Sequence, residues 1–360
     1  MLITRARITR AVLVAFAAAC AASNVCARQQ QRAGEVAFRG TLGAPGKVAI
    51  QMRLRREGEK LTGSYFYESV GKDLTLRGTI DATGGFQLQE FDAAGAQTGL
   101  FKGRWKGPEC DDCVETLAGR WTRPDGTRAL DFVLAEFPAY FTSGTRLIPK
   151  SLKESRRRGK WGGYEVAAEY PQLQGAGANT QKFNEEVRAL VLKEVGDFKK
   201  LIGDDPAQGG ESDWSFYVSY ADDSLVSVDI SDYFYYFGAG SRNAVSETFN
   251  YDLARGRALK LADIFEPSSD YLKVISDACN RELKRRFAGE SFPDAGRIAA
   301  SVEGVVGDEK KWLISKEGVV IVFDSTEFGP SGSGENTVVV PFAELKKVIR
   351  ADGPLARLAK

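Results

Sequence analysis

Carboxylates are the side chains best suited to acid–base chemistry in this sequence, because its 360 residues include no histidine. This excludes the Ser-His-Asp and Cys-His arrangements that activate nucleophiles, and it removes the usual histidine ligands of catalytic zinc. Two pairs of acids have a spacing that suits chemistry on glycans, namely Asp229 with Asp232 and Asp324 with Glu327. Catalysis by either pair is one hypothesis, and solvated positions without chemistry are the other.

Alternation along residues 225–237 favours the second hypothesis. Val226, Val228 and Ile230 are spaced to face a core. The alternate residues would then face solvent, and these are Ser227, Asp229 and Ser231. We therefore expect Asp229 to lie on a solvated face rather than in a catalytic pair.

Five consecutive aromatic residues at 233–237 place rings on both faces of the same strand. Either the strand is covered on both sides, which we favour, or one row of tyrosines is exposed as a binding surface. Tyrosine and arginine are frequent anchors of binding interfaces, and Arg242 follows this strand closely. The candidate binding residues are Tyr233, Tyr235, Tyr236, Arg242, Asn243, Asp324, Glu327 and Pro330.

Neither glycine-rich segment predicts a cofactor site. Residues 238–240 and 329–334 lack both the spacing and the lysine of a phosphate-binding loop, so they are interpreted as turns. No cofactor and no metal ion is expected. Because 49 basic residues face 48 acidic ones, there is also no general positive field that would attract nucleic acid.

The cysteines favour a structural disulfide over redox chemistry. Cys110 and Cys113 lie between two strand-like segments, which predicts a small disulfide across a hairpin tip. The two aspartates between them would disfavour the thiolate that a redox-active pair needs. Cys279 falls on the apolar stripe of a predicted helix, where a buried inert thiol is expected rather than a reactive one.

The first 27 residues have the features of a secretory signal peptide. Arg5, Arg7 and Arg10 precede an uncharged run over 11–22 that is too short to span a bilayer. Cleavage is expected after Ala27, with a site after Ala21 as the alternative and acylation at a cysteine of this region as a second one. No later run of about 20 apolar residues follows, so we expect a periplasmic or secreted protein without a transmembrane span.

Residues 36–137 predict an antiparallel β domain of seven or eight strands joined by hairpins. The candidate strands are 48–54, 61–67, 74–80, 86–91, 98–105, 114–121 and 128–135. Several contain a glycine between large apolar residues, which suits sharply coiled strands in a small up-and-down barrel. At about 100 residues the interior is expected to be packed, by Tyr65, Trp105 and Trp121 among others, rather than to hold a ligand.

Strand alternation stops at 138–163, which predicts a basic linker. Six lysines and arginines at 150–160 face a single glutamate there. A solvated linker is the favoured interpretation, and a tether for an anionic envelope polymer or lipid headgroups is the alternative. Residues 164–350 mix helices and strands, so the fold class is α+β. One helix is expected to be capped by Asn179 or Thr180 and stopped by Gly203, and another to follow Ser268 or Ser269.

Several segments of 164–350 resemble the extracellular module of RsiV-type anti-sigma factors, which also accompanies PdaC-type peptidoglycan deacetylases. They are the motif at 170–173, the helix with Asn184, the turn at 238–243, the run from Thr248 through Leu253, Gly256, the stretch 261–265, and the closing pieces 323–334 and 340–345. The resemblance implies an α+β envelope module that binds a partner, in some relatives lysozyme. Ser241 stands where the family's turn usually carries a histidine.

The function expected from the sequence is therefore a non-catalytic binding protein of the cell envelope. Its partner would be an envelope protein such as lysozyme, or a cell-wall glycan. The competing hypothesis is a carboxylate-dependent enzyme that acts on peptidoglycan or another glycan.

Overall fold

A computed structural model describes residues 35–43, 48–108, 114–205, 207–324, 327–328 and 336–360. The predicted signal peptide, the Cys110–Cys113 disulfide and Pro330 lie outside the described residues. The chain divides into two compact units, Met1–Phe137 and Pro138–Lys360. The fold is α+β, as predicted, with a β-barrel followed by mixed sheets and helices. No helix of the described part is long and apolar enough to cross a membrane.

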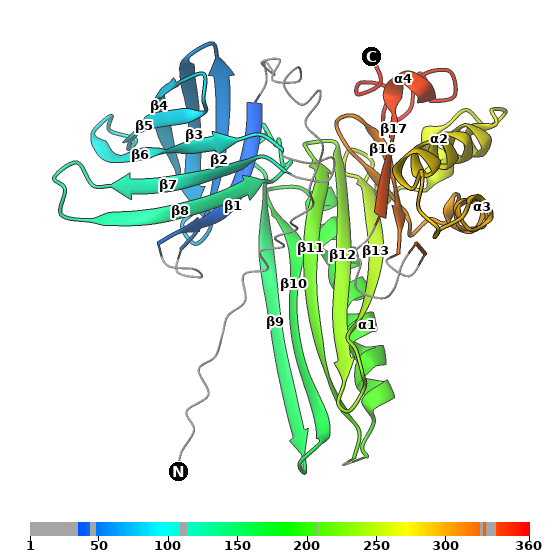
Figure 1. The fold of residues 1–360 in the computed structure, drawn as a ribbon. Coiled ribbons are helices and arrows are strands. Elements are labelled where there is room, and N and C mark those ends of the chain that lie inside the picture. Colours follow the sequence, from blue (N-terminus) through cyan, green and yellow to red (C-terminus); the bar gives the residue numbers. More distant parts are fainter. Residues whose placement is uncertain (1–34, 44–47, 109–113, 206, 325–326, 329–335) are drawn as a thin grey trace. The chain divides into compact units, whose positions relative to one another are not determined.

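The first unit is a closed barrel of eight antiparallel strands (Figure 1). Its strands are β1 (Glu35–Leu42), β2 (Val48–Glu57), β3 (Lys60–Tyr67), β4 (Asp73–Ile80), β5 (Gly85–Phe91), β6 (Gln97–Lys106), β7 (Thr116–Thr122) and β8 (Ala129–Glu136). The barrel closes where β1 pairs with both β2 and β8. Seven of these strands match the candidate strands of the sequence, and β1 was not among them.

Side chains fill the barrel, as expected for a barrel of this size. Tyr65, Phe101 and Phe132 pack edge to face, with ring centroids 5.3 Å apart in each step of that chain. Glu90 is 3% exposed, and its carboxylate accepts hydrogen bonds from Tyr65, Thr98 and Trp121. The barrel interior is thus a packed core that contains one hydrogen-bonded carboxylate.

The strand glycines permit unusually close approach between neighbouring strands. A Cβ on Gly63 would lie 1.9 Å from the carbonyl oxygen of Arg53, and one on Gly78 would lie 1.8 Å from that of Gln87. Only glycine fits such positions without a shift of the backbone. The glycines therefore explain the tight coiling that the sequence pattern predicted.

The second unit is built on a six-stranded sheet in the order β14-β13-β12-β11-β10-β9. Its strands are β9 (Arg146–Arg158), β10 (Gly162–Gln174), β11 (Gly209–Ala221), β12 (Leu225–Tyr236), β13 (Asn243–Asp252) and β14 (Arg257–Ala258). All neighbours are antiparallel except β10 and β11, which are parallel and are connected through helix α1 (Ala178–Ile202).

The prediction of a basic linker at 138–163 is wrong for its second half. Residues 146–158 form β9, an edge strand that pairs along its whole length with β10. The strand was not predicted because its charged side chains do not alternate with apolar ones. An edge strand with both faces partly solvated needs no such alternation. Lysines and arginines also protect such an edge from pairing with other chains.

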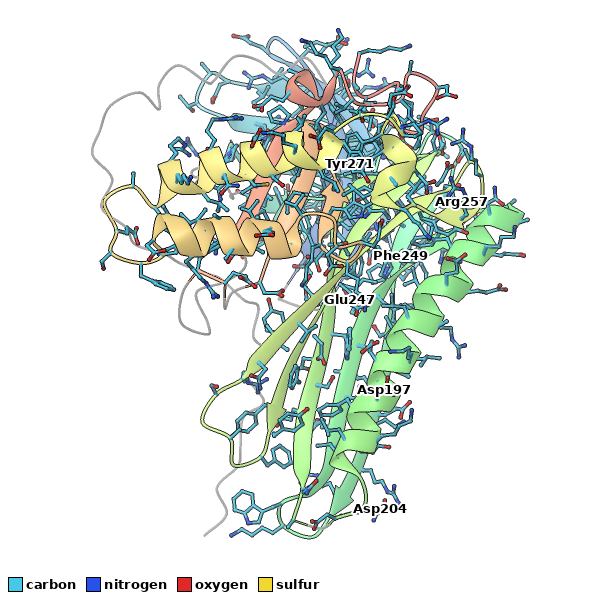
Figure 2. The ribbon with its side chains drawn as sticks, turned by 90° about the vertical axis from the view of Figure 1, so that its right-hand side faces the viewer. Asp197, Asp204, Glu247, Phe249, Arg257 and Tyr271 are labelled. Carbon is cyan, nitrogen blue, oxygen red and sulfur yellow. The ribbon has the colours of Figure 1, made fainter. Side chains whose placement is uncertain are left out.

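Helix α1 lies along one face of this sheet, with Asp197 near its end and Asp204 in the loop that follows (Figure 2). Phe183, Val187, Val191, Val195 and Phe198 are buried at helical spacing, and the helix ends at Gly203 with a φ of 62°, as predicted. The predicted side-chain cap is wrong, because the N-cap is Gly177. The Asn179 amide instead donates to the carbonyl groups of Leu253 and Ala254.

The rest of the second unit forms a small domain core around a three-stranded sheet, β15-β16-β17. Its elements are the 3-10 helix η2 (Leu261–Ile264), α2 (Tyr271–Arg286), α3 (Ala295–Val305), β15 (Trp312–Ile314), β16 (Gly318–Phe323), β17 (Asn336–Pro341) and α4 (Phe342–Leu345). Asp270, rather than Ser268 or Ser269, precedes the first residue of α2. Cys279 is fully buried on α2, and this burial raises the pKa of its thiol to about 12, consistent with an inert side chain.

Candidate functional site

Helix α1 covers one face of the six-stranded sheet, and part of the other face is exposed. On one face, Phe198 of α1 stacks on Tyr236, and Phe183 contacts Phe249 and Tyr251. Because side chains alternate along a strand, the odd-numbered residues of β12 lie on the opposite face. We call the part of that opposite face formed by Glu165, Glu169, Glu211, Asp213, Tyr217, Tyr233 and Tyr235 the open face.

The three-stranded sheet β15-β16-β17, called the small sheet below, covers this opposite face near the start of β12 and the end of β13. Ser227 is fully buried, its hydroxyl donates to Asn250, and it accepts from the Ile314 amide. The Asn250 amide in turn donates to the Trp312 carbonyl oxygen at 2.7 Å. The expectation of a solvated face is therefore wrong for Ser227 and for Asp229, which is 6% exposed, because β15 packs on this end of the sheet.

The open face presents a row of tyrosines beside carboxylates. Tyr217 is 48% exposed and Tyr233 is 49% exposed. Tyr233 pairs with Asp213 and Tyr235 pairs with Glu211 in the register of β11 and β12, so each of these tyrosines is the cross-strand neighbour of an acid. The exposed-row alternative of the sequence interpretation therefore holds for Tyr233, whereas Tyr235 is partly buried, so the strand is not covered fully on both sides.

Arg242 joins the tyrosines to the carboxylates. Its guanidinium group lies 5.8 Å from the centre of the Tyr235 ring. It also pairs with Glu211 at 2.8 Å and approaches Asp213 at 3.8 Å. The side chain is half exposed, so these contacts hold it in place and leave it accessible to a partner.

A polar cluster lies where the open face meets the small sheet. Ser231 and Ser246 both donate to the Asp229 carboxylate. The Lys311 ammonium donates to Asp324 at 2.7 Å and to the Ser246 carbonyl oxygen at 3.2 Å. Burial raises the pKa of Asp229, and the nearby charges of Lys311 and Asp324 act on it in opposite directions. We call these five residues the Asp229 cluster.

The two acids of the Asp229–Asp232 pair do not face one another in the structure, and the side chains of Asp324 and Glu327 have different partners. Asp229 and Asp232 project from opposite faces of β12, because they are three residues apart in a strand. Asp232 lies on the α1 side, where it accepts a hydrogen bond from Ser212. Glu327 accepts from Ser301 of α3 and pairs with Arg297. Asp229 is instead brought close to Asp324.

Three further candidate residues lie away from the open face or outside the described residues. Tyr236 stacks on Phe198 beneath α1. Asn243 is exposed at the start of β13, in register with Phe234 on the α1 side. Pro330 lies outside the described residues. Of the predicted set, Tyr233, Tyr235 and Arg242 therefore share one surface, and Asp324 lies near its end.

Tyr217 and Lys311 were missed by the sequence interpretation. Alternation along β11 separates Tyr217 from Trp214, Phe216 and Val218, which was a usable signal for an exposed ring. Lys311 had no such signal. It directly precedes β15, far from Asp229 in the sequence, and it joins the cluster only because the two sheets pack together.

Comparison with known proteins found similarity for part of the chain. Residues 262–343 match the family model described as "Protein of unknown function (DUF3298)". The chain is also 22% identical over 191 residues to peptidoglycan-N-acetylmuramic acid deacetylase PdaC of Bacillus subtilis (strain 168). That likeness covers 52% of this chain and 39% of the length of the relative. The second unit carries a PdaC/RsiV-like module. The matches support a cell-envelope module.

Two solved structures resemble part of this chain at low similarity. One is a DUF3298 family member from Bacteroides fragilis NCTC 9343, with a TM-score of 0.45 and 15% identity over 61% of this chain and 99% of that one. The other is a DUF3298 family protein from Pseudomonas aeruginosa PAO1, with a TM-score of 0.42 and 12% identity over 57% of this chain and 94% of that one.

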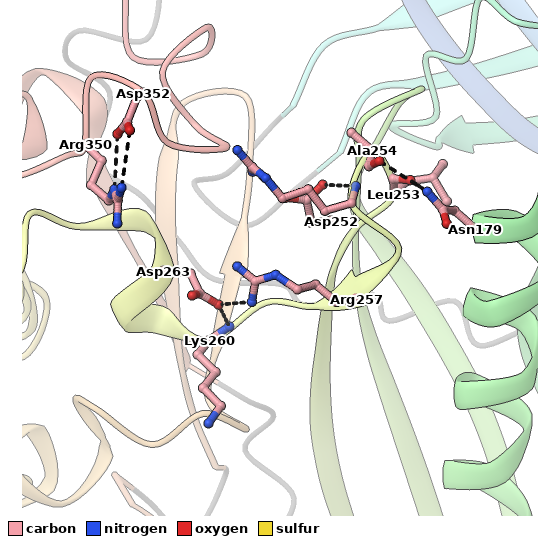
Figure 3. Close-up of polar contacts among 10 residues, drawn as sticks. Asn179, Asp252, Leu253, Ala254, Arg257, Lys260, Asp263, Arg350 and Asp352 are labelled. Carbon is pink, nitrogen blue, oxygen red and sulfur yellow. Dashed lines mark hydrogen bonds and ion pairs between the residues drawn. The ribbon is translucent and has the colours of Figure 1, made fainter.

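The motif residues of the PdaC/RsiV-like module hold backbone turns (Figure 3). Asp252 accepts from the Arg255 amide, and the Asp263 carboxylate accepts from Arg257 and from the Lys260 amide. Asn184 bonds both backbone groups of Leu173 and so ties α1 to β10. These motif residues therefore organise the framework and are not part of the open face.

Proposed function

We propose that the chain is a non-catalytic binding protein of the cell envelope, and that the open face holds its partner. The partner is an envelope protein such as lysozyme or a cell-wall glycan. The observation that carries this proposal is the pair of half-exposed tyrosines, Tyr217 and Tyr233, each with a carboxylate opposite it on the neighbouring strand.

The chemistry of the open face suits such partners. Tyrosine rings stack on the apolar faces of sugars and of protein side chains, and they lose little conformational entropy on binding. Glu211 and Asp213 can accept hydrogen bonds from hydroxyl or ammonium groups beside those rings. Arg242, pre-positioned by its ion pairs, adds a donor at the rim.

An envelope location is supported by the relative, a peptidoglycan deacetylase by name, and by the signal-like first 27 residues. The protein is proposed to be periplasmic or secreted and to act without a cofactor.

Replacing the exposed ring of Tyr233 should weaken binding. We expect Tyr233→Ala to lower affinity for a partner captured from envelope extract by about tenfold or more, as for a central aromatic anchor. Tyr233→Phe keeps the ring and should bind nearly as well. Val133→Ala, which removes another exposed apolar side chain in the barrel, serves as the control. Equal capture by Tyr233→Ala and the native chain, measured by quantitative pull-down and titration, would refute the assignment of the open face.

The Asp229 cluster favours a second candidate function, an enzyme that acts on peptidoglycan or another glycan. A buried carboxyl with a raised pKa near a second acid is a common arrangement for general acid–base catalysis. The test is turnover of a panel of glycans by the native chain and two variants. The enzyme hypothesis is supported if Asp324→Asn abolishes turnover while Glu327→Gln, a control outside the cluster, retains it. Activity that survives Asp324→Asn would exclude this cluster as its source.

A further inference from the structure

One end of the second unit combines exposed apolar side chains with cations. It is formed by the turn between β9 and β10, the last turn of α1 with the loop that follows, and the end of β12. Figure 1 shows the β9–β10 turn at the lower end of this unit, and Figure 2 places Asp204, after α1, at the same end. We call this end the sheet tip.

Apolar side chains project from the sheet tip. Trp161, in the β9–β10 turn, is 58% exposed, and Leu201, in the last turn of α1, is 63% exposed. Phe237 lies beside the turn, because a Cβ on Gly209 would meet both the Phe237 ring at 2.5 Å and the Trp161 carbonyl oxygen at 2.2 Å. Large exposed apolar residues gathered at one end of a domain mark an interaction site.

Basic residues lie in the same hairpin as Trp161. Lys160 lies over the Trp161 ring, 4.9 Å from its centre. Within the described residues neither Arg157 nor Lys160 makes an ion pair, whereas Arg156 and Arg158 are held by Asp204. The two unpaired cations are thus available to anionic groups in front of the tip.

Hydrogen bonds and an ion pair connect the segments that form the sheet tip. Arg158 donates to the Asp204 carbonyl oxygen at 2.9 Å and pairs with its carboxylate at 2.7 Å, which ties the hairpin to the loop after α1. The Gly163 amide donates to Gln208 and the Phe237 amide to Gly209, so the hairpin, β11 and β12 meet there. The basic run is therefore displayed on ordered structure and not on a linker.

We propose that the sheet tip docks on an anionic lipid bilayer, with Trp161 and Leu201 in the headgroup region and Arg157 and Lys160 on lipid phosphates. Tryptophan prefers the membrane interface, and basic residues beside it bind anionic leaflets. A soluble phosphate polymer would need the cations but not the exposed tryptophan and leucine, so the apolar residues favour lipid. This site is separate from the open-face function proposed above and does not depend on it.

Vesicle partitioning of the full chain tests the proposal. Vesicles of phosphatidylcholine with and without phosphatidylglycerol are compared, and a lipid with brominated acyl chains reports tryptophan insertion. Residues 1–27 contain no tryptophan, so quenching does not arise from that apolar segment. Trp214 and Trp312, the other two tryptophans of the second unit, are at most 7% exposed, which makes Trp161 the main source of quenchable emission in that unit.

We expect partitioning to anionic vesicles that weakens with salt and is accompanied by quenching. Arg157→Ala with Lys160→Ala should reduce partitioning about 25-fold, since each cation near the leaflet contributes about fivefold. Trp161→Ala should reduce it and abolish most of the quenching. Lys182→Ala with Arg188→Ala removes the same charge from the first half of α1 and should change nothing.

Three outcomes would overturn the proposal. They are equal partitioning to neutral and anionic vesicles, equal partitioning of the tip variant and the α1 control, and binding to an anionic phosphate polymer without quenching by brominated lipid. The last outcome would identify the polymer as the partner of the cations.

Discussion

Replacing Asn250 with alanine is expected to destabilise the second unit by about 4 kcal/mol, because each buried group left without a partner costs about 1–3 kcal/mol. Asn250 is 3% exposed and links the two sheets. Its side-chain oxygen accepts from Ser227 at 2.6 Å, and its amide donates to the Trp312 carbonyl oxygen at 2.7 Å. Alanine would leave both the Ser227 hydroxyl proton and the Trp312 carbonyl oxygen without the hydrogen-bond partner that Asn250 provides.

Hydrogen exchange as a function of urea measures this loss in the second unit alone, through peptides from β12, β13 and β15. Asn243→Ala is the matched control, since it makes the same substitution at an exposed position of the same strand. It should stay within about 0.5 kcal/mol of the native chain. Unchanged protection of β15 in Asn250→Ala would show that the network does not hold the small sheet to the large one.

Replacing Asp232 with asparagine is expected to stabilise the second unit at pH 7 by as much as about 3 kcal/mol, since one pKa unit corresponds to about 1.4 kcal/mol. Burial raises the pKa of Asp232 from 3.8 to about 6, and the Ser212 hydrogen bond opposes that rise. The folded state thus binds its proton more tightly than the unfolded state. The contribution is complete below about pH 4 and is lost as the pH rises through about 6.

The native chain should therefore lose stability between about pH 4 and 6, and Asp232→Asn should lack this part of the profile. Urea unfolding at a series of pH values, followed by exchange of β11 and β12 peptides, gives the profile. Ser212→Ala removes the bond that lowers the pKa of Asp232, so it should extend the fall to higher pH. A profile in Asp232→Asn that matches the native one would rule out Asp232 as its cause.

The barrel was largely predictable because its signals are local. Alternation and turn residues located seven of its eight strands, and the glycines indicated their close approach. Strand β9 was missed because its charged residues make no alternating pattern, and its pairing with β10 is what makes it a strand. Helix α3 was missed as well, since its sequence is rich in alanine, glycine and serine and has a short apolar stripe.

The candidate site was predictable where it depends on one strand and unpredictable where it depends on several. Period-two alternation separates Tyr233 and Tyr235 from Tyr236, whatever the fold. The burial of Ser227 and Asp229 depends on β15, which packs on them from a distant part of the chain. The Asp229 cluster depends on Lys311 in the same way, so spacing along the sequence suggested Asp232 as the partner of Asp229 when the structure supplies Asp324.

The parallel pair of β10 and β11 has a consequence for how the second unit assembles. The β9–β10 hairpin and the succession of β11, β12 and β13 each pair through short turns. Pairing β10 with β11 instead closes a loop that contains all 25 residues of α1. The entropy of loop closure is therefore concentrated in one step, and two locally formed halves of the sheet join only once the helix between them can dock.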